Sequence, residues 1–480
     1  MRVCLIIPPS PFLLDERVFP SLGVLKVAAA LEQAHLPVEV LDLSGVAAEI
    51  SALDTHLEQT EADVFGITAT MPQMPSAARI AQRIRRRRPE ARLILGGPHP
   101  TLVYNSARHE AQQGTPGRGA RMLRELQALV DVVVAGDGEK AILEAVGAHP
   151  APVIDAEQPT SVLFLTKPEL NAAPLPARHL IDCASYHYAI DGTPAQSLIA
   201  QLGCPFGCKF CGGRRSPFLR KVRTRSTHEV IREMRHLFDT YGTKGFMFFD
   251  DELNVNTQFA ELLRAMIALQ DELGVAFRLR GFLKSELLTE EQVALMYEAG
   301  FRQVPIGFES GSDRMLTNMQ KGATVAENTR CVRILHQHGI QVKALMSIGH
   351  PGESAETVTA TRDWLLQVQP DDFDLTVITP YPGTPYFDEA VPNPDGTYTY
   401  TAKSGDVLHM QDVDHLADVT FYKGIPGAYQ AFVWSEALSR SAIVAARDRV
   451  DAEVRDRLGL ALSPIPTAAA AYDHSMGVSA

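Results

Sequence analysis

The chain has 480 residues, which exceeds the usual size of one hydrophobic core and favours two domains with additional segments. Hydrophobic residues make up 45% and charged residues 21%, as in ordinary globular proteins, and no apolar run approaches the roughly 20 residues that span a bilayer. The formal net charge of −12 argues against a general attraction to nucleic acid or anionic lipid. We therefore expect neither a nucleic-acid partner nor a membrane.

The cysteines and the N-terminus indicate the compartment. Three of the six cysteines are clustered and three are scattered (Cys4, Cys183 and Cys331), a usage that argues against a disulfide framework. Residues 1–9 contain a short apolar segment without a cleavage-site pattern, which is better interpreted as a buried first strand than as a signal peptide. We therefore expect a cytoplasmic protein.

The first 147 residues alternate short apolar runs with amphipathic stretches. Candidate strands cover residues 3–7, 38–43, 64–68, 92–95 and 130–134, and candidate helices cover residues 22–34 and 77–88. Continuous β-branched runs separated by helices are typical of a parallel sheet that is covered on both faces. We therefore expect an α/β protein that begins with a doubly wound, Rossmann-like domain over residues 1–147.

Short glycine-rich or polar segments follow the expected strands of this domain. They are residues 8–11, 68–71, 96–100 and 136–139. Ligands of doubly wound folds bind outside the carboxyl ends of the strands, and small residues there can admit a slender group. No G-x-G-x-x-G sequence follows the first strand, which disfavours a dinucleotide. Ordinary turn chemistry remains the alternative interpretation.

Two segments interrupt the regular pattern. Residues 108–125 form a basic, glycine-containing stretch, which we interpret as an inserted loop that either shields a ligand or is tolerated at the surface. Residues 148–196 are rich in proline and alanine with little periodicity, as expected for an extended linker. A second domain is expected to begin at residue 197.

This second domain opens with the most specific motif of the chain. Cys204, Cys208 and Cys211 follow the apolar run 197–202 with C-x-x-x-C-x-x-C spacing. A glycine-rich loop can bring three thiolates to one iron–sulfur cluster, and three thiolates leave one iron of a 4Fe–4S cube free to bind another molecule. Zinc sites normally show two ligand pairs, and no second C-x-x-C or H-x-x-x-H follows. A structural zinc site or three unconnected thiols remain the alternatives.

Five further apolar runs follow, with helical stretches between them. They lie near residues 245–249, 276–280, 304–308, 342–348 and 373–378. With the run at 197–202 they make six β/α units, too few for a closed eight-stranded barrel. We therefore expect a partial (β/α)6 TIM-type barrel over residues 197–390, with its active face at the carboxyl ends of the strands. Residues 391–480 are expected to form a small, mainly helical C-terminal cap with a frayed tail.

Polar motifs occupy the expected strand ends of the barrel. Asp250 and Asp251 end the second strand, where a carboxylate can accept a hydrogen bond from an ammonium group; a helix N-cap is the alternative. Glu309, at the end of the fourth strand, can accept hydrogen bonds from both hydroxyls of a ribose, and Ser310 can add one contact. A buried turn is the alternative for this pair.

Later strand ends offer further candidates. Ile348 ends the fifth strand, where it could pack on an adenine face, and Tyr381 follows the sixth strand, where it could contact the edge of the base. We assign no catalytic residue, but His350, Tyr381 and Arg280 are candidates. A local hydrogen bond is an equally good interpretation of His350, and an arginine on the third strand could hold an anionic substrate.

Together, the cysteine loop and the strand-end motifs along residues 195–390 resemble the radical S-adenosylmethionine (SAM) superfamily. The segments 19–31, 38–43, 64–68, 93–101 and 130–140 resemble the cobalamin-binding domain that precedes the radical domain in cobalamin-dependent radical SAM enzymes. The D-x-H-x-x-G motif, whose histidine ligates cobalt in some corrinoid proteins, is absent. The resemblance therefore implies a cobalamin without a histidine ligand from the protein.

The resemblance also implies which residues hold which cofactor. Cys204, Cys208 and Cys211 would ligate a 4Fe–4S cluster. The implied SAM contacts are Phe210, Asp250, Asp251, Glu309, Ser310, Ile348 and Tyr381. The implied cobalamin contacts are Thr68, Ala69, Thr70, Gly96 and Gly97. His350 and Asp137 depart from the family pattern, which usually has an aliphatic residue and a glutamate at these positions.

The implied activity is methyl transfer from methylcobalamin, with a 5′-deoxyadenosyl radical, to an unactivated carbon or phosphorus of a small molecule or natural-product intermediate. An external electron donor of the flavodoxin or ferredoxin type would be the protein partner. The same constellation serves non-methylating rearrangements and cyclisations, which this sequence does not separate from methylation. A corrinoid-binding sensor or carrier with a structural cluster, and a radical SAM enzyme with an empty first domain, are further alternatives.

Overall fold

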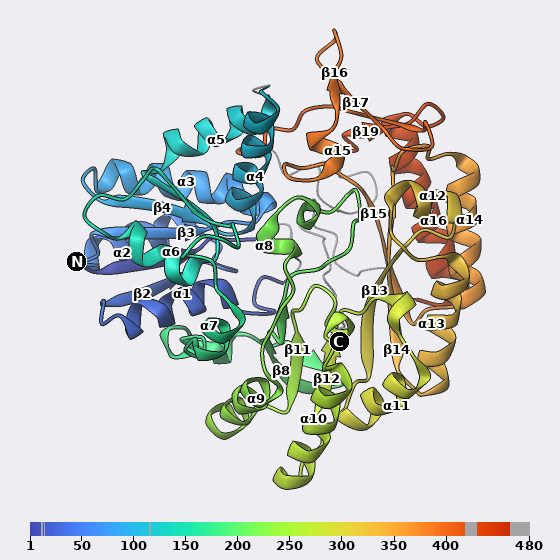
Figure 1. The fold of residues 1–480 in the computed structure, drawn as a ribbon, viewed down its shortest axis with the longest axis horizontal. Coiled ribbons are helices and arrows are strands. Elements are labelled where there is room, and N and C mark those ends of the chain that lie inside the picture. The colour runs from blue at the N-terminus through green and yellow to red at the C-terminus, as the bar shows by residue number, and fades with distance from the viewer. Residues whose placement is uncertain (11–12, 14, 115–116, 418–429, 461–480) are drawn as a thin grey trace.

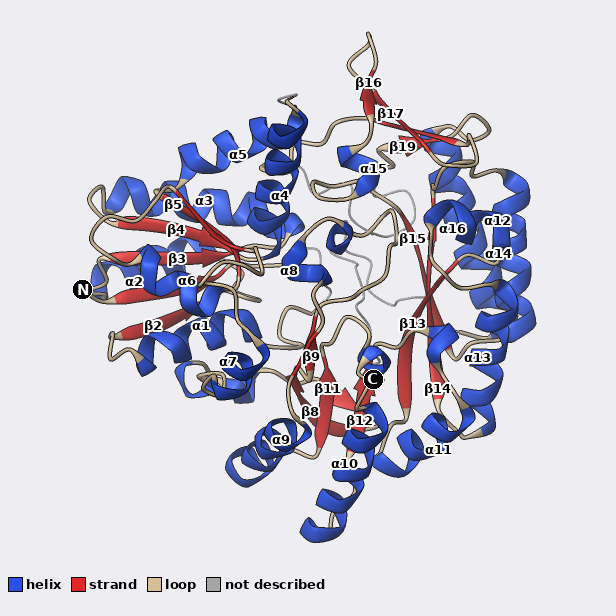
Figure 2. Ribbon diagram, viewed as in Figure 1, coloured by secondary structure: helices blue, strands red, loops and turns tan. Residues whose placement is uncertain are grey.

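The computed structural model consists of two α/β halves (Figures 1 and 2). It describes residues 1–480 except 11–12, 14, 115–116, 418–429 and 461–480. In Figure 1 the first half, in blue and cyan, lies beside an open barrel drawn in green to orange. α4 (Pro98–Gln113) and α8 (Pro217–Arg220) lie where the two halves meet. Within the described ranges, no helix is both long and apolar enough to cross a lipid bilayer.

The first half is built on a six-stranded parallel sheet in the order β2-β1-β3-β4-β5-β6. Its strands are β1 (Val3–Ile7), β2 (Val38–Asp42), β3 (Val64–Thr68), β4 (Arg92–Gly96), β5 (Val132–Gly136) and β6 (Val153–Ala156). One face packs on α1 (Leu22–Gln33) and α6 (Gly138–Ala145), the other on α2 (Glu49–Gln59), α3 (Met74–Arg87) and α5 (Arg118–Leu129). Because both faces are covered, the central strands are apolar and buried. The predicted doubly wound fold is confirmed.

β6 lies in the segment interpreted as a linker. It pairs in parallel with β5, from Val133 opposite Val153 to Gly136 opposite Ala156. The chain then continues through α7 (Lys167–Ala172) and two 3-10 turns to β7 (Ala189–Ile190), at the edge of the second half. The connector therefore contributes an edge strand to each half of the molecule.

The second half is a partial barrel of six parallel strands. They are β8 (Thr193–Leu198), β11 (Gly245–Phe248), β12 (Arg278–Gly281), β13 (Gln303–Glu309), β14 (Gln341–Ile348) and β15 (Asp372–Val377). The outer helices are α9 (Thr227–Tyr241), α10 (Phe259–Leu273), α11 (Glu290–Ala299), α12 (Asp313–Met319), α13 (Val325–Gln337) and α14 (Ala355–Val368). Two isolated parallel bridges connect this part of the barrel: Leu279 on β12 pairs with Phe301, just before β13, and Leu283, just after β12, pairs with Ile306 on β13. The predicted (β/α)6 partial barrel is confirmed.

The region after the barrel contains a sheet that the sequence analysis did not predict. After α15 (Pro385–Asp388), a four-stranded antiparallel sheet is formed by β16 (Val391–Pro392), β17 (Tyr398–Thr401), β18 (Val407–Met410) and β19 (Val433–Trp434). α16 (Arg440–Leu458) then packs on α14 and β15. These strands are too short to produce a clear periodic signal. The expected frayed tail falls within 461–480, outside the described residues.

The stretch 108–125, predicted to be an inserted loop, is mostly helical. α4 continues to Gln113 and α5 begins at Arg118. The side chain of Arg118 is 6% exposed and lies 3.7 Å from the ring centroids of both Phe387 and Tyr398. Its guanidinium also donates a hydrogen bond to the backbone oxygen of Phe387 at 2.6 Å. The loop prediction is wrong: the segment is a helical hairpin that docks on the second half.

Candidate active site

The cysteine loop lies between two short paired strands. β9 (Gln201–Leu202) and β10 (Arg223–Thr224) are antiparallel, and their pairing closes the loop. Gly203, at its base, has a φ of +85°, and a side chain there would meet a backbone oxygen at 2.4 Å. Only glycine fits such a position without displacing the backbone. The closed loop carries all three clustered thiols, Cys204, Cys208 and Cys211.

The donor set of this loop fits an iron–sulfur cluster. Burial raises the pKa of the Cys204 thiol to about 12 and also raises the pKa of Cys208, so without a bound cation both remain protonated. Ligation by iron would hold these sulfurs as thiolates. All six cysteines are free of disulfides, and the other three lie in β1, in a 3-10 turn and in α13. No further cysteine is therefore placed to cap a fourth iron.

Aromatic rings and lysines surround the cysteine loop. The ring of Phe210 meets that of His350 edge-on, with 5.4 Å between centroids, and the Nζ of Lys321 lies 6.0 Å from the Phe210 centroid. On the other side, the Nζ of Lys284 lies 4.7 Å from the ring centroid of Phe206. Both ammonium groups would counter the negative charge of a cluster bound by the three thiolates. Neither lysine was singled out as a cofactor contact from the sequence, because isolated lysines carry no motif.

Asp250 and Asp251 have different surroundings. The two carboxylate oxygens of Asp250 accept backbone N–H groups of Ala200 at 3.0 Å and Gln201 at 2.6 Å, and the side chain is buried. Asp250 thus holds the junction of β8 and β9. Asp251 is exposed, and the next residue, Glu252, is partly exposed. These two carboxylates are the accessible part of the motif.

A chain of hydrogen bonds joins the ends of β13 and β14. Glu309 accepts from the Nζ of Lys321 at 2.9 Å with one oxygen and from the hydroxyl of Ser347 at 2.8 Å with the other. The Nε2 of His350 lies 2.8 Å from the Ser347 hydroxyl, and its Nδ1 lies 3.2 Å from the hydroxyl of Tyr386. Glu309 also has a φ of +66°, which is costly for a residue other than glycine and is typical of functional sites.

The charge state of Glu309 follows from these contacts. Burial acts to raise the pKa of its carboxyl, but the charge of Lys321 and the hydrogen bonds from Lys321 and Ser347 together bring the pKa below its usual value. Glu309 is therefore ionised at neutral pH. A carboxylate has about four lone-pair sites, so each oxygen can accept one more hydrogen bond.

The remaining predicted SAM contacts lie around the same strand ends. Ser310 is buried, with its hydroxyl 3.1 Å from that of Thr361, and Ile348 is 1% exposed at the end of β14. The hydroxyl of Tyr381 accepts the backbone N–H of Gly212, just after the last cysteine, at 3.3 Å. Tyr381 thus links the end of β15 to the cysteine loop.

Two of the three catalytic candidates are enclosed by protein. Arg280 is 1% exposed and donates hydrogen bonds to the hydroxyl of Tyr188 and the side-chain oxygen of Gln303, both at 3.0 Å. His350 is fully buried in the hydrogen-bond chain. Neither side chain is exposed to solvent in this structure. Tyr381 is partly exposed.

A cavity of about 370 Å³ lies at the carboxyl ends of the first sheet. Thr68, Thr70, Gly96 and Gly97 line it, whereas Ala69 is fully buried and does not. Gly97 has a φ of +102°, and a side chain there would press on the Thr68 hydroxyl at 2.7 Å. Glycine therefore keeps this wall open. A narrow cavity with small and hydroxyl residues fits a slender, nucleotide-like tail.

The second half of the molecule forms part of the wall of this cavity. Its contribution to the lining is apolar: Ile199, Leu202, Phe218 and Leu219. Beside them, Arg223 on β10 forms an ion pair with Asp137 at the start of α6, with 2.5 Å between N and O and both side chains 2% exposed. The Arg223 guanidinium also lies over the ring of Phe164 at 4.3 Å. Sequence reasoning missed this pair, since its members are separated by 86 residues.

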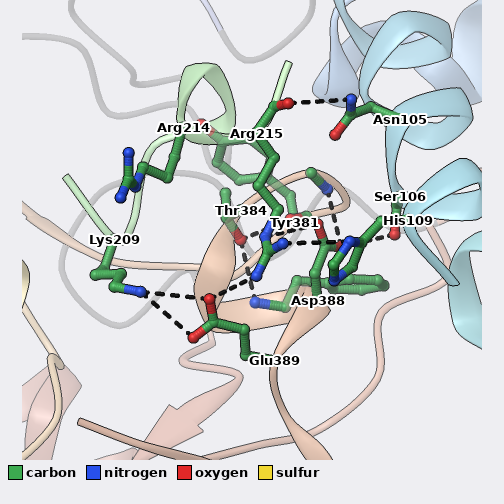
Figure 3. Close-up of polar contacts among 12 residues, drawn as sticks. Asn105, Ser106, His109, Lys209, Arg214, Arg215, Tyr381, Thr384, Asp388 and Glu389 are labelled. Carbon is green, nitrogen blue, oxygen red and sulfur yellow. Dashed lines mark hydrogen bonds and ion pairs between the residues drawn. The ribbon is translucent and has the colours of Figure 1, made fainter. Parts of the chain in front are cut away.

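α4 connects the cavity to the cysteine loop. Figure 3 shows Arg215, just after the loop, between α4 and the segment that follows β15. Its guanidinium lies 2.5 Å from the carboxylate of Glu389 and 3.2 Å from the Nδ1 of His109 on α4. Also on α4, Ser106 donates to the carboxylate of Asp388 at 2.7 Å. These contacts fix the cavity and the cysteine loop relative to each other.

Two family models match the chain, one on each half. The B12 binding domain matches residues 16–127, and the Radical SAM superfamily matches residues 198–365, a range that includes the cysteine loop. The chain therefore combines a B12-binding domain with a radical SAM domain. The radical SAM domain implies a 4Fe–4S cluster and SAM, and the B12-binding domain implies cobalamin.

Several curated proteins resemble the chain over most of its length. It is 27% identical to an uncharacterized methyltransferase of Pyrococcus horikoshii, over 82% of this chain and 84% of that protein. It is 27% identical to the anaerobic magnesium-protoporphyrin IX monomethyl ester cyclase of Cereibacter sphaeroides (70% and 54%). It is 28% identical to the bacteriochlorophyllide d C-12(1)-methyltransferase of Chlorobaculum tepidum (68% and 65%). The chain spans less than two thirds of the length of the last two relatives.

Solved structures share the arrangement of the two halves. The radical SAM methyltransferase TsrM of Kitasatospora setae, with cobalamin and a 4Fe–4S cluster bound, superposes with a TM-score of 0.62 at 20% identity, over 84% of this chain and 81% of that one. The cobalamin-dependent radical SAM enzyme OxsB gives a TM-score of 0.54 at 16% identity, over 76% and 51%. At these identities the likeness is one of fold.

Proposed function

We propose that this radical SAM enzyme is a methyltransferase that acts on an unactivated carbon or phosphorus of a small molecule. The observation that carries the proposal is the junction between its two sites, where α4 and the Arg223–Asp137 ion pair fix the cavity against the cysteine loop. A radical source and a methyl carrier serve one reaction only at a fixed, short separation. The methyltransferases among the relatives support this reaction class.

The loop and strand-end residues would act together on SAM. When bound, the cluster with SAM supplies a 5′-deoxyadenosyl radical, and cobalamin supplies a methyl group. Cys204, Cys208 and Cys211 would ligate three irons of the cluster and leave the fourth free to bind SAM. Glu309, held ionised by Lys321, would accept hydrogen bonds from the two ribose hydroxyls of SAM on its remaining lone pairs.

The residues of the first domain would hold and enclose cobalamin. Thr68, Thr70, Gly96 and Gly97 line the channel for its nucleotide tail. Phe218 and Leu219, contributed by the second half, add apolar side chains to the lining of that channel. The tail would thus lie in a cavity that residues of both domains line.

The protein would need an electron from outside. An external donor of the flavodoxin or ferredoxin type is its expected partner, because the loop provides ligands for one cluster and the remaining cysteines are dispersed. Six cysteines without a disulfide fit a cytoplasmic enzyme.

Cyclisation without methyl transfer is the second candidate. It is favoured by the similarity to the magnesium-protoporphyrin IX monomethyl ester cyclases, which match this chain over 70% of its length in the Cereibacter sphaeroides enzyme. Both candidates require the same three cofactors and the same cysteine loop. The two candidates differ in the fate of the methyl group of SAM: methyl transfer moves it to the substrate, whereas cyclisation does not.

An anaerobic assay tests the proposal. The chain is reconstituted with iron, sulfide and cobalamin, and is then supplied with SAM and a reductant. We expect both 5′-deoxyadenosine and S-adenosylhomocysteine from the wild type and neither from Cys208→Ala, with Cys183→Ala as the matched control that keeps both activities. Absence of 5′-deoxyadenosine from a cluster-loaded wild type would contradict the radical assignment. Formation of 5′-deoxyadenosine alone would favour the cyclase candidate.

A further inference from the structure

Three metal-ligating side chains converge at the edge of the first sheet, away from the cofactor sites. Cys4 on β1 and Glu39 on β2 are directly opposite each other in the parallel register, so their side chains point to the same face of the sheet. α2 covers that face and contributes His56. In Figure 1, β2 and α2 lie on the side of the first half that is remote from the barrel.

We propose that Cys4, Glu39 and His56 bind a zinc-class divalent metal ion. The Nε2 of His56 lies 3.5 Å from the Sγ of Cys4 and 3.2 Å from the Oε1 of Glu39, and the three ligand atoms all lie within 4.8 Å of one another. Tetrahedral zinc, with bonds of about 2.3 Å to sulfur and about 2.0 to 2.2 Å to nitrogen and oxygen, places sulfur and nitrogen about 3.5 Å apart and nitrogen and oxygen about 3.3 Å apart. The spacing in this structure matches both distances.

One metal ion between the three ligand atoms would explain why the Cys4, Glu39 and His56 side chains point toward one another. One and the same ring nitrogen, Nε2, faces both the thiol and the carboxylate. A histidine that only joined two partners by hydrogen bonds could use its two ring nitrogens, one for each partner. Convergence of three donors on one point is the arrangement that a metal ion requires.

The surroundings of the three groups suit a metal site. The Thr60 hydroxyl contacts the Oε1 of Glu39, and the N–H of Ala62 donates to the Thr60 hydroxyl at 3.0 Å, which orients the carboxylate. The side chains of His56 and Glu39 are 23% and 29% exposed, so an ion can enter from solvent and keep water as its fourth ligand. Cys4 is fully buried. A divalent cation would bind its sulfur as thiolate.

The ligand set selects the ion class and the role. One thiolate, one imidazole and one carboxylate suit zinc or a similar transition metal better than magnesium or calcium, which prefer oxygen ligands. Bound there, the ion ties β1, β2 and α2 together and stabilises the folded first domain. This site is separate from the cysteine loop and does not rest on the proposed function.

Zinc binding to the full chain tests the proposal. The parent is the Cys204→Ala/Cys208→Ala/Cys211→Ala variant, which removes the thiols of the cysteine loop as competing ligands. Equilibrium dialysis with zinc and elemental analysis should give one zinc per chain. Cys4→Ala and His56→Gln should each weaken binding at least about 100-fold, and Thr60→Val, which removes only an orienting contact, about 10-fold. Cys331→Ala, at another buried cysteine, is the matched control and should leave binding unchanged.

Two further measurements distinguish the loss of a metal ligand from a failure of the variant to fold. Cobalt(II) in place of zinc should give a thiolate-to-cobalt charge-transfer band that is lost in Cys4→Ala, and zinc should raise the thermal unfolding temperature of the parent but not that of His56→Gln. A parent that takes up no zinc would overturn the proposal. Zinc bound equally well by the parent, Cys4→Ala and His56→Gln would overturn it too.

Discussion

At the residue scale, the hydrogen-bond chain from Glu309 through Ser347 and His350 to Tyr386 fixes which group donates and which accepts at each link. Burial lowers the pKa of His350 to about 3, so the imidazole is neutral at pH 7 and carries one proton. Ser347 donates its single proton to Glu309, so its oxygen must accept from Nε2–H of His350. Nδ1 then accepts from the hydroxyl of Tyr386. His350 therefore acts as a positioning residue for Glu309.

His350→Leu should weaken SAM binding about tenfold, because the loss of one hydrogen bond in a network that ends on a charged group costs about 1.5 kcal/mol. SAM affinity and the rate of 5′-deoxyadenosine formation in the reconstituted enzyme check this. Tyr386→Phe, at the far end of the chain, should have a smaller effect. If His350→Leu kept its iron and bound SAM as tightly as the wild type, the positioning role would be wrong.

His350 also makes the free energy of unfolding depend on pH. Between its ordinary pKa of 6.5 and its folded value of about 3, His350 binds a proton in the unfolded chain but not in the folded one. The free energy of unfolding that it contributes therefore falls as pH decreases below about 6.5, by at most about 1.4 kcal/mol per pH unit. Urea unfolding of the cluster-free chain at pH 7 and pH 5 should show a steeper loss for the wild type than for His350→Leu. Equal pH slopes would contradict this.

At the element scale, the α4–α5 hairpin joins the two halves of the molecule. Arg118 lies at the first position of α5 and is held between two aromatic rings and a backbone oxygen of the second half. A guanidinium that is desolvated against a ring contributes up to about 2 kcal/mol. The hairpin is therefore part of the interdomain joint, although its sequence predicted only a basic loop.

Arg118→Ala should lower the free energy of unfolding by about 2 to 4 kcal/mol, because it removes two cation–π contacts and one hydrogen bond. Arg124→Ala, on the same helix but exposed, is the matched control and should change stability by less than about 0.5 kcal/mol. Urea unfolding monitored by circular dichroism checks both variants. Equal stabilities of the two variants would show that Arg118 does not fasten the joint.

At the scale of the whole molecule, the sequence predicted what depends on local pattern. Both parallel folds follow from periodicity, and the three-cysteine loop follows from spacing in one short segment. The contacts of Asp250 and Arg223 could not be predicted from the sequence. Asp250 binds two backbone N–H groups, and Arg223 pairs with a carboxylate 86 residues away. Contacts that only tertiary packing creates leave no periodic or spacing signal in the chain.

We propose that the two halves of the molecule hold a SAM-cleaving cluster and a methyl-carrying cobalamin in one working site. The most direct test uses SAM with a deuterated methyl group, supplied anaerobically with reductant to the cobalamin-loaded enzyme. Mass spectrometry of the protein-bound cobalamin and of the released nucleosides is then the measurement. We predict a deuterated methyl group on cobalamin together with S-adenosylhomocysteine and 5′-deoxyadenosine. Release of 5′-deoxyadenosine while the bound cobalamin stays unlabelled would contradict the claim.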